Sequence, residues 1–365
     1  MAEALKDRYS KKFYAHISEV FNDTLPDFDE KKFVKLIFSK DWKNLELKDR
    51  MKHTAKVLHV FLPSNFAKAA KLITKTCKEF QKRGYDNYGL EFMFFPDYVE
   101  TYGIEYFKSS LQVMENITEL TSCEFAIRPF IIKYPKDAME QMLNLSKHKN
   151  LHVRRLASEG SRPRLPWAIA LPAFKKNPKP VLPILENLKQ DESEYVRRSV
   201  ANNLNDISKD HPEVLLKIAK KWKGKSEDTD AIIKHASRTL FKAGDPRIMA
   251  FYGLDIKGVS LDNFKVVTPK IKVGDYVRFK FDISTQKKKY LRLEYAIYFL
   301  MKNGKLSKKV FKISEKDYAA KSTTKITKAH SFKIISTRNY NNGKHEVSVI
   351  VNGVELGKGE FVLAL

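Results

Sequence analysis

The sequence is short of cysteine and of long apolar runs, and both shortages narrow the class of protein. Only Cys77 and Cys123 occur in 365 residues, too few for a disulfide framework, so we expect two buried thiols in a reducing cytoplasm. No stretch of 18 apolar residues could span a membrane, and the first residues lack the apolar segment of a secretory signal. Phosphate-binding glycine loops, nucleophile elbows and metal-ligand spacings are also missing. We therefore expect no metal and no cofactor.

Acidic residues are scarce relative to basic ones. The chain has 68 Lys and Arg against 43 Asp and Glu, a formal net charge of +25. The excess is densest in residues 261–365, with 22 Lys and Arg against 9 Asp and Glu. Such a surface attracts polyanions, either nucleic acid or an anionic membrane. A membrane partner would need an amphipathic helix with clustered lysines beside exposed aromatics. The sequence shows none cleanly, which favours nucleic acid.

Residues 1 to about 252 have the apolar spacing of consecutive helices. Asp29 is placed to cap one of them, and the aromatic run within 90–102 is typical of helix-packing core. From about residue 118 a pattern repeats: Val153-Arg154-Arg155 returns as Val196-Arg197-Arg198 and, more weakly, as 232–235. A period of 35–45 residues with two helices per unit predicts HEAT-like repeats, which stack into a curved solenoid.

Beyond residue 252 the apolar spacing changes to the alternation of β-strands. Short alternating segments follow one another, and Asn303-Gly304, Asn342-Gly343 and Asn352-Gly353 are turn dipeptides. About seven strands predict an immunoglobulin-like sandwich. The predicted fold is thus an α-helical HEAT-like-repeat solenoid followed by a smaller all-β immunoglobulin-like domain. We expect the helical domain over 1–252, a junction over 253–268 and the sandwich over 269–365.

One basic stretch, residues 153–167, carries a single acid among its cations. Glu159 stands just before Gly160, and Pro163 follows, so a helix is expected to end there. A carboxylate at a helix C-terminus faces the negative end of the helix dipole, and Arg162 can compensate. The pattern suits a site that holds a polyanion and stabilises a small positive charge. Alternatively, Glu159 only forms a surface ion pair with Arg155, four residues earlier.

Three motifs resemble a known family. ELTSCEFAIRPF (119–130), ASEGSRPRLPWA (157–168) and EYVRRSVANNLNDISKDHPE (194–213) are similar to those of the HEAT-like-repeat DNA alkylation-repair glycosylases, and the AlkC branch fits best. That branch joins a helical solenoid to an immunoglobulin-like domain, and the resemblance covers essentially the whole chain. It implies a monofunctional glycosylase that releases cationic N-alkylated bases, chiefly 3-methyladenine and 3-methylcytosine, from double-stranded DNA. We expect a monomeric base-excision repair enzyme in the cytoplasm.

The resemblance also implies site residues. Glu124 and Glu159 match acidic positions of the branch, Asp206 matches a polar position in the next repeat, and Trp167 matches a tryptophan after RPRLP. A carboxylate stabilises the oxocarbenium-like sugar that forms when a cationic base departs, or positions the attacking water. The predicted DNA-binding residues are Arg162, Arg164, Trp167, Arg197, Arg198, Asn202, Lys287 and Lys288.

Two alternatives stay open at this point. Paired arginines at a repeat turn, here Arg154, Arg155, Arg197 and Arg198, often bridge one repeat to the next instead of binding phosphate. The lysines of the β-domain could equally be a solvated strand edge. For the whole chain, the alternative to an enzyme is a HEAT-repeat scaffold that binds nucleic acid through charge alone. Such a scaffold has no use for carboxylates in its groove, because they repel phosphate.

Overall fold

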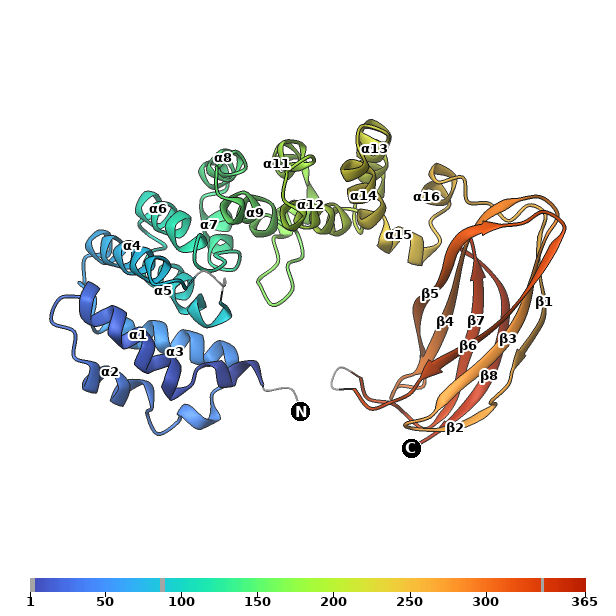
Figure 1. The fold of residues 1–365 in the computed structure, drawn as a ribbon, viewed down its shortest axis with the longest axis horizontal. Helices are drawn as coiled ribbons and strands as arrows, with labels where there is room; N and C mark the ends of the chain where they lie inside the picture. Colours follow the sequence, from blue (N-terminus) through green and yellow to red (C-terminus); the bar gives the residue numbers. More distant parts are fainter. Residues whose placement is uncertain (1–3, 86–88, 336–337) are drawn as a thin grey trace. The chain divides into compact units, whose positions relative to one another are not determined.

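The computed structural model describes residues 4–85, 89–335 and 338–365 and divides them into two compact units. Unit 1 ends at Ala236 and unit 2 runs from Ser237 to Leu365. Unit 1 is a helical repeat array and unit 2 contains an all-β domain (Figure 1), as predicted. The division lies before the predicted helical boundary at residue 252. The assignment of 1–252, 253–268 and 269–365 as functional domains stays a prediction.

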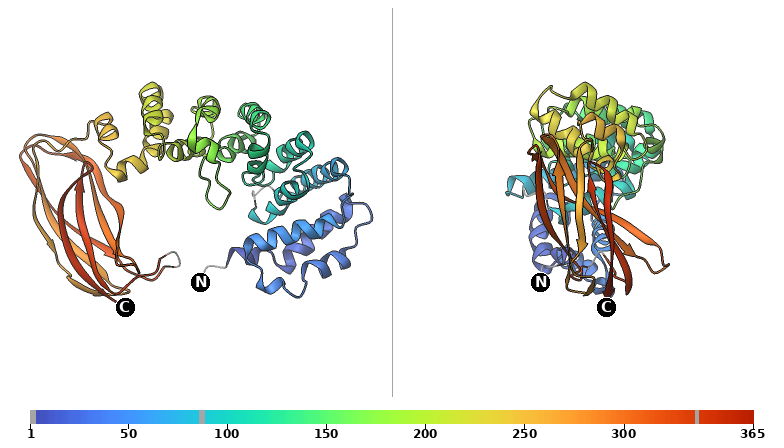
Figure 2. Two further views of the ribbon diagram at one scale, coloured as in Figure 1. Left: turned by 180° about the vertical axis from the view of Figure 1, so that it is seen from behind. Right: turned by 90° about the vertical axis from the view of Figure 1, so that its right-hand side faces the viewer.

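Unit 1 is built from pairs of short helices stacked side by side. The helices form two rows, which we call the inner and outer rows. The inner row lies on the concave side of the unit (Figures 1 and 2). The outer row is α4 (Phe66–Lys82), α6 (Phe107–Thr118), α8 (Pro135–Leu145), α11 (Leu182–Leu188) and α13 (Pro212–Trp222). The inner row is α3 (Leu47–His59), α5 (Phe94–Tyr102), α7 (Ile127–Lys133), α9 (Leu151–Gly160), α12 (Glu194–Ile207) and α14 (Glu227–Ala236). Unit 1 also contains the α-helices α1 (Lys11–Thr24), α2 (Glu30–Ile37) and α10 (Pro172–Lys176), together with short 3-10 helices.

Local sequence accounts for where these helices begin and what they bury. The Asp29 side chain accepts a hydrogen bond from the Lys32 amide and caps α2, as predicted. Pro135 and Pro212 occupy the first positions of α8 and α13, where no amide hydrogen is needed. The aromatic run within 90–102 is confirmed as core, because Phe92, Phe94, Phe95 and Tyr98 are buried.

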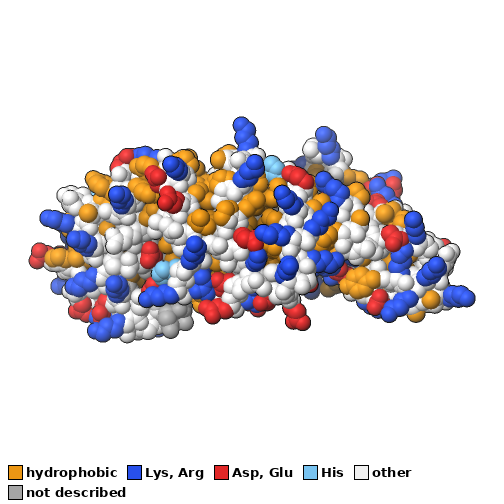
Figure 3. All heavy atoms as spheres, turned by 90° about the horizontal axis from the view of Figure 1, so that it is seen from above, with side chains coloured by type: hydrophobic (Ala, Val, Ile, Leu, Met, Phe, Trp, Pro, Cys, Tyr) orange, Lys and Arg blue, Asp and Glu red, His pale blue; other side chains and the backbone are white. Residues whose placement is uncertain are grey.

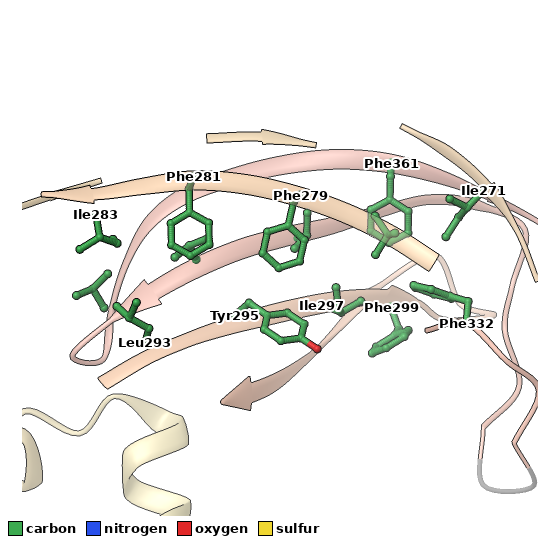
Figure 4. Close-up of a cluster of buried hydrophobic side chains, with 14 of the residues drawn as sticks. Ile271, Phe279, Phe281, Ile283, Leu293, Tyr295, Ile297, Phe299, Phe332 and Phe361 are labelled. Carbon is green, nitrogen blue, oxygen red and sulfur yellow. The ribbon is translucent and has the colours of Figure 1, made fainter. Parts of the chain in front are cut away.

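Unit 2 is a sandwich of two sheets preceded by two short helices, α15 (Arg238–Ala243) and α16 (Pro246–Phe251). The strands are β1 (Val259–Val266), β2 (Lys270–Lys272), β3 (Tyr276–Thr285), β4 (Lys289–Leu300), β5 (Leu306–Tyr318), β6 (Ser322–Ser331), β7 (Gly343–Val351) and β8 (Val354–Ala364). One sheet has the order β1-β3-β6 and the other β2-β8-β7-β4-β5. Alternating side chains from both sheets, such as Phe279, Phe281 and Ile297, fill the space between them (Figure 4).

Two details of this region can be compared with the predictions from the sequence. The segment predicted as a junction contains β1, whose Leu261, Phe264 and Val266 pack against the sandwich core. The predicted turn at Asn352-Gly353 joins β7 to β8 with φ values of 47° and 81°, as a two-residue type I′ hairpin requires.

The helices α15 and α16 belong with the sheets because their side chains pack on one end of the sandwich. The Arg292 guanidinium lies 4.6 Å from the Phe241 ring centroid. A Cβ added to Gly244 would lie 2.5 Å from the backbone oxygen of Gly353, so the two backbones approach closely. These contacts explain why unit 2 begins at Ser237.

Candidate active site

The repeated motifs occupy equivalent helices of the inner row. Arg154 and Arg155 lie on α9, Arg197 and Arg198 lie on α12, and the weaker third copy forms α14. The α12 helix packs against both α9 and α14. The repeat inferred from the sequence therefore places three matching helices side by side on the concave face of unit 1 (Figure 1).

Glu159 lies in the last turn of α9, which ends at Gly160 as predicted. Gly160 is needed for packing: a Cβ there would lie 2.7 Å from Cγ2 of Ile127 on α7. Glu159 is only 5 % exposed. Arg162 Nη1 donates to its Oε1 over 2.6 Å, and Ser199 Oγ donates to its Oε2 over 2.6 Å. Arg155 Nη2 is 3.7 Å from Oε1, so the predicted ion pair exists but lies inside the protein, not on its surface.

Arg162 joins Glu159 to Asp206. Its Nε donates to Asp206 Oδ2 over 2.9 Å, and Lys209 Nζ donates to Oδ1 over 3.0 Å. Asp206 is 1 % exposed and Arg162 is 7 % exposed. Burial lowers the pKa of Arg162, but Glu159 and Asp206 outweigh it, so the pKa lies above its ordinary value. The structure thus places Arg162, predicted as a phosphate contact, between two buried carboxylates.

Glu124 lies just before α7 and is the most accessible of the three predicted acids. Arg155 Nη1 donates to its Oε2 over 2.6 Å, and Ser122 Oγ donates to the same oxygen over 2.7 Å. Its Oε1 has no hydrogen-bond partner among the described residues, and the side chain is 15 % exposed. The Arg155 guanidinium also stacks on Tyr195, 4.5 Å from the ring centroid.

These contacts form one continuous series of alternating charges, which we call the acid–guanidinium chain. In order it consists of Glu124, Arg155, Glu159, Arg162, Asp206 and Lys209. It crosses from the segment before α7, through α9, to the end of α12. Carboxylates 82 residues apart in sequence are thereby connected through two arginines, Arg155 and Arg162.

The loop of residues 161–171, which we call the Trp167 loop, follows α9 and extends from the inner row on the concave side (Figure 1). Trp167 is 62 % exposed and has a φ of 67°, a left-handed conformation that costs a residue other than glycine roughly 1–3 kcal/mol. The backbone oxygen of Trp167 accepts a hydrogen bond from Lys48 of α3. The Leu171 amide donates to the Pro163 oxygen over 3.1 Å and closes the loop at its base.

Arg128 on α7 holds this loop through hydrogen bonds to its backbone. Its Nη1 donates to the oxygens of Gly160 and Arg162 over 3.0 and 2.8 Å, and its Nε donates to that of Ile169 over 2.5 Å. The side chain is fully buried, and its Nη2 has no partner among the described residues. Burial first, and then Arg162, lower its pKa to about 10, so the guanidinium remains charged at neutral pH.

Arg154 and the predicted DNA contacts Arg164 and Arg197 are engaged with acids of unit 1. Arg154 binds both oxygens of Asp191, over 2.6 and 3.0 Å, and the equivalent Arg197 lies 3.0 Å from Asp228. Asp191 lies just before α12 and Asp228 lies in the first turn of α14, so each arginine pairs with an acid of the following repeat and these two arginines do bridge repeats. Arg164 forms a two-point pair with Asp210.

The remaining predicted contacts are more open. Arg198 is exposed and pairs with Glu194 one turn earlier, 2.8 Å away. Asn202 Oδ1 is 3.2 Å from Nε2 of His235 on α14. In unit 2, Lys287 and Lys288 are exposed in the turn between β3 and β4, and Lys288 Nζ is 3.7 Å from Asp317.

Sequence reasoning missed Arg128, Lys48 and Ser199. Arg128 stands inside the CEFAIRPF motif, yet nothing in the sequence distinguishes a buried arginine from a surface one. Ser199 lies 40 residues from Glu159 and reaches it only because α9 and α12 pack together. Within the described ranges 4–85, 89–335 and 338–365, no group of three or more His, Cys, Asp or Glu could hold a metal ion. Among these residues no helix has the length and apolar character to cross a membrane.

Fold and site together define a helical-repeat protein with an immunoglobulin-like domain and buried acids on its concave face. A family described as DNA alkylation repair enzyme matches residues 104–240. The C-terminal immunoglobulin-like domain of protein YhaZ matches residues 260–365.

Two relatives extend the match to the full chain. Protein YhaZ of Bacillus subtilis (strain 168) is 42 % identical over 350 residues, 96 % of each chain. The alkylpurine DNA glycosylase AlkC of Pseudomonas fluorescens, bound to DNA containing an abasic site analog, is 34 % identical over 100 % of both chains, with a TM-score of 0.92. The chain therefore belongs to the AlkC-like DNA alkylation repair family, and the family resemblance inferred from the motifs is confirmed.

Proposed function

We propose that the protein is a monofunctional DNA glycosylase that hydrolyses the N-glycosidic bond of cationic N-alkylated bases, with 3-methyladenine and 3-methylcytosine as its substrates. The observation that carries the proposal is the acid–guanidinium chain. It gathers Glu124, Glu159 and Asp206 on the concave face of a strongly basic protein. Family membership and the DNA-bound AlkC relative support it. We further propose that it acts in the cytoplasm as a monomer and without a cofactor.

The chemistry of a cationic base explains why carboxylates suffice. Alkylation at N3 already gives the base a positive charge, so it departs without being protonated by a strong acid. The difficult species is the sugar, which gains positive charge as the C1′–N bond stretches. A carboxylate beneath the sugar stabilises that charge or orients the attacking water, and such a group contributes roughly 10²–10⁴-fold to the rate.

The contacts of the three acids support different roles for them in this proposal. Both oxygens of Glu159 and both oxygens of Asp206 are already bound by neighbouring side chains. Glu124 keeps Oε1 uncommitted, so we assign Glu124 as the group that contacts the sugar or the water. Arg155 and Glu159 then hold Glu124 in place, and Asp206 supports them through Arg162.

The other predicted residues would position DNA. Trp167, exposed on a loop fixed at two points, would stack on a base or a sugar, an interaction worth about 1–3 kcal/mol. Arg198 and Asn202 would contact phosphates on the concave face, and Arg164 and Arg197 would do so where their ion pairs open. In this proposal Arg162 acts on DNA indirectly, through the acids that it joins.

The immunoglobulin-like domain would grip the duplex backbone. Lys287 and Lys288 extend from an exposed turn of a domain in which no catalytic cluster was predicted. Replacing both by glutamate should weaken DNA binding and make it less sensitive to salt, because each phosphate contact contributes about 0.9 to the salt slope. Unchanged affinity and salt slope would remove these two lysines from the interface.

The test of the proposal is single-turnover release of methylated bases by Glu124→Gln and Glu159→Gln. We expect Glu124→Gln to lose roughly 10²–10⁴-fold in rate while it binds abasic-site DNA as the wild type does. Glu159→Gln should lose rate as well, accompanied by a drop in thermal stability, because its carboxylate is buried among arginines. If both variants keep the wild-type rate, the acids are not catalytic. If the wild type itself releases no base, the scaffold alternative stands.

A further inference from the structure

The solvent-facing side of α4 consists almost entirely of lysine. Its exposed positions are Ala67, Lys68, Lys71, Lys75, Lys78 and Lys82. The lysines are spaced by three and four residues, so they form one stripe along the helix, which we call the α4 lysine face. From Lys68 to Lys82 the stripe runs about 21 Å at 1.5 Å per residue.

The charges of this face are not neutralised. None of the five amines forms an ion pair among the described residues, and Lys75 Nζ donates only to the backbone oxygen of Asp23, over 3.3 Å. Glu79, an acid of the same helix, forms an ion pair with Arg83 over 2.9 Å. Like charges three or four residues apart destabilise a helix by about 0.2–0.5 kcal/mol per pair. The stripe thus costs stability and needs another reason to exist.

Another helix of the outer row shows the usual mixture of charges. The exposed positions of α8 include Lys136, Asp137, Glu140 and Asn144. Figure 3 looks down on this outer surface, where lysine and arginine side chains stand out from the helices. The face of α4 therefore differs from that of α8, because its charged side chains are all of one sign.

A cavity beside the stripe adds hydrogen-bonding groups to the charge. It lies between α4 and α6 and has a volume of about 350 Å³. Lys71, Thr74 and Lys78 line one side, and Ser109, Gln112 and Asn116 line the other; no acid is among the lining residues. Ammonium, hydroxyl and amide groups together are the donors that proteins direct at phosphate oxygens.

We propose that the α4 lysine face and the α4–α6 cavity bind the sugar–phosphate backbone of a second duplex segment, separate from the segment at the acid–guanidinium chain. One DNA strand places a phosphate about every 3.4 Å along the axis, so the stripe spans about six phosphates. The stripe itself carries no apolar side chain larger than Ala67, whereas a helix that lies in a membrane surface needs an apolar face. Because α4 is in the outer row and α9 and α12 are in the inner row (Figure 1), one chain could hold two segments.

The test counts duplexes bound per chain. Full-length protein is titrated with an undamaged 20-base-pair duplex at low salt, and the stoichiometry is measured by sedimentation. We expect two duplexes for the wild type and one for Lys71→Gln/Lys75→Gln/Lys78→Gln. If the variant still binds a second duplex weakly at the lowest salt, the salt slope of that binding should be about 2–3 lower than in the wild type. The matched control Lys136→Gln/Lys147→Gln/Lys149→Gln removes the same charge from exposed positions in and near α8 and should still bind two.

This inference rests on only one part of the proposed function, the binding of DNA. The outcomes below therefore test the two separately. Base release by the α4 variant should stay within about twofold of the wild type; a wild type without base release would sink the proposed function and leave the duplex count decisive. One duplex per wild-type chain, or equal counts and slopes in the α4 variant and the wild type, overturns the inference. A third result would also overturn the inference: the wild type binds phosphatidylserine vesicles, and the α4 variant loses that binding but still binds two duplexes. The α4 lysine face would then bind a membrane.

Discussion

Replacing Arg162 by methionine would remove the cation that lies between two buried carboxylates. Methionine keeps most of the side-chain volume but leaves Glu159 without its 2.6 Å partner and Asp206 without its 2.9 Å partner. Removing one member of a buried ion pair typically costs about 3–5 kcal/mol, because a buried charge is left uncompensated. For a unit of this size each kcal/mol lowers Tm by about 2–4 °C, so we expect a fall of roughly 6–20 °C.

Thermal unfolding of full-length variants measures this cost, with Arg164→Met as the matched control. Arg164 loses the same charge, but its pair with Asp210 lies near the surface, where such pairs contribute about 0–1 kcal/mol. Arg162→Met combined with Glu159→Gln and Asp206→Asn should recover much of the loss, because no buried charge remains unpaired. If Arg162→Met and Arg164→Met melt within about 2 °C of each other, the acid–guanidinium chain is not the buried network described above.

Two further predictions concern the loop anchor and the pH dependence of stability. Arg128→Met should release the Trp167 loop: acrylamide should then quench Trp167 more strongly, base release should fall, and Arg128→Lys should restore part of both. Trp42 and Trp222 are buried, so the quenching reports Trp167; unchanged quenching in Arg128→Met would contradict the anchoring role. Burial, reinforced by Glu100 and opposed by Lys52 and Lys48, raises the pKa of Asp97 to about 7. The folded state therefore holds this proton more tightly than the unfolded state, and the associated stability is lost as the pH rises from about 4 to 7. We therefore compare the free energy of unfolding of Asp97→Asn and the wild type at pH 4 and pH 8. The difference in favour of the variant should be about 1–3 kcal/mol larger at pH 8 than at pH 4, which is less than the full pKa shift implies because Asp97 is partly exposed. If the stability of both proteins depends on pH in the same way, the assignment is wrong.

The architecture could be read from the sequence because it depends on local periodicity. The recurrence of Val-Arg-Arg placed α9 and α12 in equivalent positions, and Asn352-Gly353 marked a two-residue hairpin by its need for positive φ. The extent of unit 2 could not be read in this way. Contacts such as that of Phe241 with Arg292 join α15 to the sheets across 51 residues. Local sequence patterns do not predict contacts between such distant residues.

The candidate site shows the same division between local and distant information. The motifs indicated Glu124, Glu159 and Asp206, but their partners depend on how three repeats pack. Arg162 appeared from its position to be a surface cation beside an acid, whereas the packing of α9 on α12 buries it between two acids. Arg154 and Arg155 are adjacent in sequence, yet Arg154 pairs with Asp191 before α12 and Arg155 pairs with Glu124 before α7, because neighbouring residues on a helix point in different directions.

The most direct test of the account is the detection of free base from duplex DNA that contains a single 3-methyladenine. Wild-type protein in excess should release the methylated base and leave an abasic site, and Glu124→Gln should do so roughly 10²–10⁴-fold more slowly while it binds the same DNA equally well. Release at the same rate by both proteins would contradict the role given to the uncommitted Glu124 oxygen, and no release by either would leave only a basic helical cradle for DNA.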